Sequence, residues 1–408
     1  MSSETPWNTD KWFVSPWNYL PEATEGFQFA DQIQVHDLTL RDGEQQAGFC
    51  FRSDEKIRIA GRLAELGVHR IEAGTPAVSK DDERAVREIA RLNLGPRIFA
   101  LARCRVEDVK QVVDCGCDGA IVEIPCSEHM LEYAYGWSLE QAIEMSVNAT
   151  RFAKKQGLYV VFFPIDSTRT EINWYLDLIA HVASYGGMDA LALVDTTGTL
   201  APHAVPYMVE KTRQRLPGVP LECHFHNDFG LGAANTLAGL AAGAEVAHLT
   251  VTGIGERGGS APLEDVAVSL LTMYGIDLGI KYEQLTALSQ LIRELSPLEI
   301  PNNRQIVGDD LFDMESGIIT DWWQNCRHDH PLEVFPFHWD LVGQKPPGVV
   351  LGKKSGRASI ALRLEEMGVQ ATQEQMLDMM WRVKDKSIEK KGLLTDEEFQ
   401  EIVRSVLE

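Results

Sequence analysis

The sequence predicts an α/β protein whose main part is a TIM (β/α)8 barrel, followed by a post-barrel, mainly helical C-terminal subdomain. Short apolar runs rich in β-branched residues recur eight times at intervals of roughly 20–40 residues, the length of a strand–helix repeat. Amphipathic stretches such as Ser53–Leu66 and Ala85–Leu92 lie between these runs. Glycine closes several such stretches, for example Gly67 and Gly116, as expected at a helix C-cap with positive φ.

Eight strands in series with intervening helices predict a closed parallel barrel with its active site at the C-terminal strand ends. An open doubly wound sheet is the alternative, and it usually carries a glycine-rich phosphate loop after its first strand. Here the first strand runs into the charged segment 41–45, which favours the barrel. The expected strands are Ile33–Leu40, His69–Ala73, Arg97–Arg103, Gly119–Pro125, Leu158–Asp166, Ala190–Thr196, Leu221–Asn227 and Val246–Thr252.

The chain is expected to contain three further parts besides the barrel. Residues 1–30, rich in Trp and Pro, predict an N-terminal arm packed on the barrel or on a second subunit. The barrel itself, the catalytic domain, takes 31–299; an irregular linker subdomain takes 300–358 and a helical C-terminal subdomain 359–408. The helices expected in the last part are Ser359–Met367, Thr372–Lys391 and Thr395–Leu407.

Composition and charge restrict the class of protein. Of the 408 residues, 44% are hydrophobic and 24% charged, which is ordinary for a globular protein. The net charge of -22, from 38 Lys and Arg against 60 Asp and Glu, disfavours a nucleic-acid partner. We expect no membrane span and no secretory signal. Seven scattered cysteines without a disulfide pattern indicate reduced thiols and a cytoplasmic location.

A pair of histidines ends the seventh expected strand. His224 and His226 are two residues apart, so both imidazoles point to the same face of that strand and toward the barrel mouth. Two neutral imidazoles on a rigid strand are suited to hold one metal ion, although a chance pair of hydrogen-bonded histidines is the alternative.

Charged residues follow the first expected strand. Asp42 is expected to complete a His/His/Asp set that suits Mg²⁺, Mn²⁺, Fe²⁺ or Zn²⁺. Arg41 then stands beside the metal, where it can stabilise a developing alkoxide or enolate. The alternative for Arg41 is a structural ion pair with Glu44 or Glu72.

Three further strand ends carry polar side chains. Glu72 ends the second strand and is expected either to orient Arg41 or to act in acid–base catalysis. Arg103 ends the third strand and Thr196 the sixth, and both suit a substrate that bears a carboxylate. A local hydrogen bond is the alternative role for the threonine. The sequence indicates no particular residues for binding a cofactor.

Taken together, three motifs resemble those of the DRE-TIM metallolyases, and within them the 2-isopropylmalate, homocitrate and citramalate synthases. They are Leu38-Thr-Leu-Arg-Asp-Gly-Glu-Gln45, His224-Phe-His-Asn-Asp228 and Gly253-Ile-Gly-Glu-Arg257. The post-barrel segments 301–308, 315–318 and 350–357 are also similar to this family.

The resemblance implies an HMGL-like acyltransferase of amino-acid biosynthesis that joins a 2-oxo acid to acetyl-CoA, releases CoA and acts as a homodimer. By position, Asp42, His224 and His226 hold the metal and Arg41 stabilises the keto oxygen with Glu72 beside it. Thr196 contacts the oxo-acid carboxylate, and Arg103 lies in the substrate pocket.

The chain departs from the family pattern at residues that transfer protons. Ile319 stands where these synthases have a histidine, and Ile165 where they have a glutamate. Other acid–base residues are therefore expected, among them His129, Glu315 or Asp321. Two alternatives follow: a metal-dependent aldolase or lyase that cleaves a related hydroxy acid, and a non-catalytic paralogue that binds metal and ligand.

Overall fold

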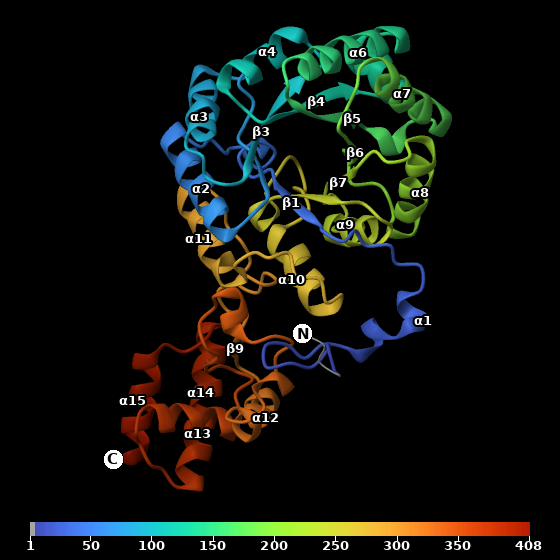
Figure 1. Cartoon of the computed structure of the whole chain (residues 1–408). Coiled ribbons are helices and arrows are strands. Elements are labelled where there is room, and N and C mark those ends of the chain that lie inside the picture. Colours follow the sequence, from blue (N-terminus) through green and yellow to red (C-terminus); the bar gives the residue numbers. More distant parts are fainter. Residues whose placement is uncertain (1–4) are drawn as a thin grey trace. The chain divides into compact units, whose positions relative to one another are not determined.

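The computed structural model describes residues 5–408, and these form two compact units (Figure 1). One unit runs from Trp17 to Glu299. The other combines residues 5–16 with Ile300–Glu408. The segment expected as an N-terminal arm is thus divided between the units at Pro16. No helix among residues 5–408 has the length and apolar character that a membrane crossing requires.

The first unit is a closed barrel of eight parallel strands in sequential order, which confirms the predicted TIM barrel and excludes the open sheet. Figure 1 shows these strands surrounded by helices. Most of the strands end within one or two residues of their expected limits; β1 and β8 end three residues earlier. The strands are β1 Gln34–Asp37, β2 Arg70–Glu72, β3 Arg97–Arg103, β4 Gly119–Pro125, β5 Tyr159–Ile165, β6 Ala190–Asp195, β7 Leu221–Phe225 and β8 Val246–Leu249.

Amphipathic helices cover the outside of the barrel. The helix α2, Ser53–Leu66, buries Ile59 and Leu63 on one face and ends where Gly67 adopts a left-handed conformation, φ 101°. The expected helix at 85–92 extends back to Lys80 because Ser79 caps its N-terminus. The remaining helices of this unit are α3 Lys80–Arg91, α4 Val106–Cys115, α6 Leu139–Lys155, α7 Ile172–Tyr185, α8 Val205–Arg215, α9 Gly232–Ala241, α10 Leu263–Met273 and α11 Leu285–Leu295, with short turns at α1 Pro21–Thr24 and α5 Glu128–Met130.

The barrel interior is filled by side chains from alternate positions of the strands. One side is apolar and is formed by residues of β3 to β6 that include Phe99, Ile121 and Phe163. The opposite side is polar: Glu222 of β7 accepts hydrogen bonds from Arg70 at 2.7 Å and pairs with His248 at 2.6 Å. These buried contacts link β2, β7 and β8 inside the barrel.

The second unit has its own core. Apolar side chains of α13, α14 and α15 form it, with Met379, Val383 and Phe399 at its centre. The segment 300–358 is expected to be irregular, but it contains a regular helix and a small two-stranded parallel sheet, so this part of the prediction is wrong. The elements of this unit are β9 Asp313–Met314, α12 Gly317–Cys326, β10 Gly348–Val349, α13 Arg357–Glu366, α14 Gln373–Lys390 and α15 Asp396–Leu407.

Candidate metal and substrate site

The chain turns sharply after β1, and this turn presents Arg41 and Asp42. Asp37 ends the strand and its carboxylate accepts both the backbone N–H and the hydroxyl of Thr39, each at 3.0 Å. The backbone then folds back on itself, since Arg41 and Gly43 donate N–H groups to the Leu38 carbonyl. Arg41 and Asp42 are both buried in consequence, at 7% and 2% exposure.

The two histidines at the end of β7 point into the same space. The Nε2 atoms of His224 and His226 lie 3.2 Å apart. The Nδ1 of His226 is 3.1 Å from the Gly259 carbonyl oxygen, which fixes this ring with its Nε2 lone pair facing inward. Burial first, then His226, His248 and Arg41, lowers the pKa of His224 well below its usual range. His224 is therefore neutral near pH 7, as a metal ligand must be.

Asp42 meets these histidines, as the sequence predicts. The three side chains offer ligand atoms that lie within 4.8 Å of one another, and all three are buried. The Asp42 carboxylate is 4.0 Å from Nε2 of His226. Two nitrogens at about 2.1 Å from one cation and at roughly a right angle are about 3 Å apart, close to the observed separation.

Unpaired polar atoms indicate that the cluster fits a cation. Among the residues described, Oδ2 of Asp42 is buried without a hydrogen-bond partner. Ser260 forms an isolated β-bridge with His226, and its hydroxyl is also buried without a hydrogen-bond partner among these residues. A buried carboxylate oxygen without a partner is costly, and a divalent ion would satisfy it. The donor set of two imidazoles and a carboxylate suits such an ion.

Arg41 pairs with Glu72 beside the cluster. Its Nε lies 2.9 Å from Oε2 of Glu72, and Nη1 donates to Gln45 at 2.8 Å and lies 3.5 Å from Asp42. The guanidinium also covers the Phe163 ring at 5.9 Å. Glu44, the other expected partner, instead binds Lys56 at 2.5 Å.

The environment leaves one donor of this arginine free. Nη2 of Arg41 is buried and lacks a hydrogen-bond partner among residues 5–408. Burial raises the pKa of Glu72 to about 7, although Arg41 opposes the shift. Burial also raises the pKa of Glu123, on the neighbouring inward face of β4. The site therefore presents a fixed cation with a donor ready for an oxygen atom, next to the Glu72 carboxyl group with its pKa of about 7.

Thr196 and Arg103 have partners of their own. The hydroxyl of Thr196 accepts the backbone N–H of Asp166 at 2.7 Å, so its own proton remains available to a ligand. Arg103 is half-exposed and its Nε lies 2.5 Å from Asp108 of α4. The structure thus joins Asp42, His224, His226, Arg41 and Glu72 in one group, and ties Arg103 to the neighbouring helix.

Two participants in the site have no clear sequence signal. The Gly259 carbonyl that orients His226 lies just after the motif Gly253-Ile-Gly-Glu-Arg257, and only the fold shows that it reaches this ring. Gln45 is part of the first motif, but only the fold shows that it holds Arg41. The first hydrogen bond joins two segments that are far apart in the sequence, and the second joins residues four positions apart.

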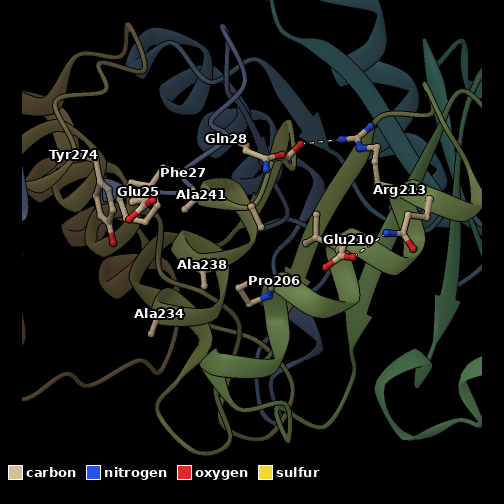
Figure 2. A pocket seen from close by; sticks show the side chains of 15 residues that line it. Glu25, Phe27, Gln28, Pro206, Glu210, Arg213, Ala234, Ala238, Ala241 and Tyr274 are labelled. Atoms are coloured by element: carbon tan, nitrogen blue, oxygen red, sulfur yellow. Dashed lines mark hydrogen bonds between the residues drawn. The ribbon is translucent and has the colours of Figure 1, made fainter. Parts of the chain in front are cut away.

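A cavity of about 870 Å³ lies elsewhere on this unit, outside the barrel (Figure 2). Alanines of α9, among them Ala234 and Ala238, lie on one side of it, and Glu210 and Arg213 of α8 on the other. The segment 25–28 that precedes β1 also lines it. Because that segment leads into the N-terminal end of its strand, this cavity is separate from the cluster at the C-terminal strand ends.

A parallel barrel with polar and charged side chains gathered at its C-terminal strand ends defines a TIM-barrel enzyme, and the Asp/His/His cluster could hold a metal ion. Comparison with known proteins identifies the family. The HMGL-like family model matches residues 32–292, and the chain belongs to this family, as its motifs predict.

Curated relatives cover nearly the whole chain. The homocitrate synthase AksA of Methanothermobacter thermautotrophicus is 36% identical over 396 residues, 97% of this chain and 98% of the relative. The 2-isopropylmalate synthase of Methanocaldococcus jannaschii is also 36% identical, over 95% of this chain and 74% of its own. These names agree with the prediction of an acyltransferase that forms carbon–carbon bonds.

Solved structures support the fold. The HMG-CoA lyase from Brucella melitensis superposes with a TM-score of 0.59 at 20% identity, covering 66% of this chain and all of that one. The hydroxymethylglutaryl-CoA lyase from Pseudomonas aeruginosa gives 0.58 at 21% identity, over 65% and 93%. At this sequence identity, the similarity to the two lyases supports the barrel fold only.

Proposed function

We propose that this protein catalyses a divalent-metal-dependent Claisen condensation between a 2-oxo acid and acetyl-CoA, and forms a 2-hydroxy diacid of the alkylmalate type. The observation that carries the proposal is the buried meeting of Asp42, His224 and His226 next to the Arg41–Glu72 pair. The relatives named homocitrate and 2-isopropylmalate synthase support the choice of reaction.

In this proposal Asp42, His224 and His226 hold the cation, which can be Mg²⁺, Mn²⁺ or Zn²⁺. When bound, such an ion supplies a Lewis acid that polarises the keto group of the 2-oxo acid. Gly259 keeps His226 in the tautomer that has Nε2 free for the ion.

Arg41 stabilises the oxygen on which negative charge develops. Its Nη2 is the buried donor without a partner, and its other nitrogens are fixed by Glu72 and Gln45. A donor that is already oriented requires little reorganisation as charge develops, which is the condition for effective stabilisation of a transition state. Glu72 is thus a positioning residue in this proposal.

The substrate's carboxylate is placed beside β6. Thr196 can donate its hydroxyl proton to that carboxylate while it accepts the N–H of Asp166. Arg103, half-exposed near the mouth, would have to leave Asp108 to reach an anionic group of the oxo acid or of the acyl-CoA. We further propose a cytoplasmic location, which agrees with seven unpaired cysteines among the described residues. The homodimer is proposed on the family resemblance alone.

A thiol-release assay tests the proposal. The protein is given Mn²⁺ or Mg²⁺, acetyl-CoA and a panel of 2-oxo acids, and free CoA is measured with a thiol reagent. Release that requires both the cation and one of the oxo acids supports the synthase. Liberation of an oxo acid from hydroxy diacids without thiol release would support the lyase instead, and binding without turnover the non-catalytic paralogue.

A further inference from the structure

A buried carboxylate organises the loops that follow β4 and β5. Asp166 comes directly after β5 with a left-handed backbone, φ 63°, and is fully buried. Its carboxylate accepts a hydrogen bond from the Ser127 hydroxyl at 2.5 Å and from Nε of Arg169 at 2.7 Å. Its backbone N–H donates to Thr196, which places this carboxylate next to the proposed subsite for the substrate's carboxylate.

An imidazole contacts this carboxylate from the solvent side. Nε2 of His129 lies 3.1 Å from Oδ2 of Asp166, and the His129 side chain is 45% exposed. Because Nε2 lies beside the carboxylate, Nδ1 is the ring nitrogen that remains to accept a proton. His129 lies in the turn α5, which continues as a π-helical turn at Leu131–Tyr135. Turns of this type are frequent at functional sites.

Several other titratable groups at these strand ends lie beside charged partners. Asp42, His224 and His226 form the cation cluster, and Glu72 is bound to Arg41. Arg41 and Arg103 both act on Glu123 electrostatically. His129 differs from all of these because a buried carboxylate orients it while one edge stays open to solvent.

We propose that His129 is the general base of the condensation and that Asp166 positions it. The proposal rests on the proposed function and deepens it by naming the group that removes the proton. The pairing resembles an Asp–His couple, in which the carboxylate holds the imidazole in place.

The step balances as follows. Nδ1 of His129 takes one proton from the methyl group of acetyl-CoA, and the C–H electron pair moves to form the thioester enolate. The enolate carbon forms a bond to the keto carbon of the oxo acid, whose π electrons go to its oxygen as an alkoxide beside Arg41. The imidazolium returns its proton to the alkoxide, and water then cleaves the thioester to a carboxylic acid and free thiol.

The test compares His129→Gln with His181→Gln in the full-length protein. His181 is an exposed histidine of α7 in contact with the Tyr185 ring, so its replacement is the matched control. With Mn²⁺ and acetyl-CoA, His129→Gln should lower kcat for thiol release by at least about 10²-fold, the scale of one lost general base. Its affinity for the 2-oxo acid, measured by calorimetry without acetyl-CoA, should stay within about twofold of the wild type.

A second variant separates catalysis from structure. Added imidazole should restore part of the kcat of His129→Ala, because the open edge admits a free base, and should leave His181→Ala unchanged. If the wild type releases thiol and His129→Gln matches His181→Gln, the role of His129 is overturned and the proposed function stands. If the wild type releases no thiol with any oxo acid, the proposed function fails and this role fails with it.

Discussion

Replacement of Arg41 by alanine gives the most informative single perturbation of the site. Arg41 contacts Glu72, Gln45 and Asp42 and leaves Nη2 free for an oxygen of the reacting group. Loss of one oriented donor to a developing oxyanion costs about 10²–10³-fold in kcat, or roughly 3–4 kcal/mol. We therefore expect kcat of Arg41→Ala to fall by that factor, while the cation ligands stay in place.

The same change also affects stability, and the structure limits by how much. Removal of one partner from a buried pair costs about 3–5 kcal/mol if the remaining group stays ionised. Burial raises the pKa of Glu72 to about 7 even with Arg41 present, so without it the carboxyl binds a proton at neutral pH. The loss of unfolding free energy should consequently stay below that range, and the variant should remain folded.

The assay measures thiol release, Mn²⁺ affinity by calorimetry and unfolding in denaturant on the same samples. Arg151→Ala is the control, because Arg151 lies on the exposed side of α6, where it donates to the Tyr185 carbonyl. A kcat within about threefold of the wild type would remove Arg41 from the mechanism. A parallel loss of Mn²⁺ binding would instead make Arg41 part of the cation site.

Three other predictions concern pH, backbone and cation. Burial raises the pKa of Asp37 to about 7, so the native state holds a proton that the unfolded chain releases, and stability falls as pH rises from about 4 to 7. Asp37→Asn removes this loss, so its unfolding free energy relative to the wild type should rise by about 3 kcal/mol between about pH 5 and pH 8. A difference between the two proteins that stays constant with pH in urea titrations would contradict the shift. Gly259→Ala should weaken Mn²⁺ affinity by about 10–100-fold, because Gly259 has φ +83° and a Cβ there would collide with the Gly253 carbonyl. An unchanged affinity in calorimetry would refute the orienting role of this loop. Mn²⁺ at about 100 times its Kd should stabilise the wild type by about 2.7 kcal/mol and His226→Gln hardly at all, so equal melting shifts in both would place the ion elsewhere.

Much of the fold could be predicted because strand periodicity and glycine caps are local signals. The two histidines on β7 share a face for the same reason, since alternation along a strand is fixed by the backbone. Their meeting with Asp42 followed from barrel closure, which brings β1 beside β8, next to β7. These inferences need only the order of elements and the direction of the strands.

Other features depend on contacts that no local pattern reveals. β1 was expected to reach Leu40, but it ends at Asp37 because that side chain binds Thr39 and turns the backbone. The sequence does not predict the helix α12, because it is short and lies in a segment rich in aromatic residues and prolines, where an amphipathic pattern is hard to recognise. The Arg103–Asp108 pair and the contact of His129 with Asp166 depend on side-chain geometry between neighbouring loops.

The central claim is that one divalent ion is held by Asp42 and both imidazoles of β7. Pulsed electron paramagnetic resonance of Mn²⁺ bound to the full-length protein tests it directly, because imidazole nitrogens bound to Mn²⁺ modulate the electron spin echo. We predict nitrogen modulation from two imidazoles in the wild type, reduced to one in His226→Gln. Tightly bound Mn²⁺ without nitrogen modulation would contradict the account.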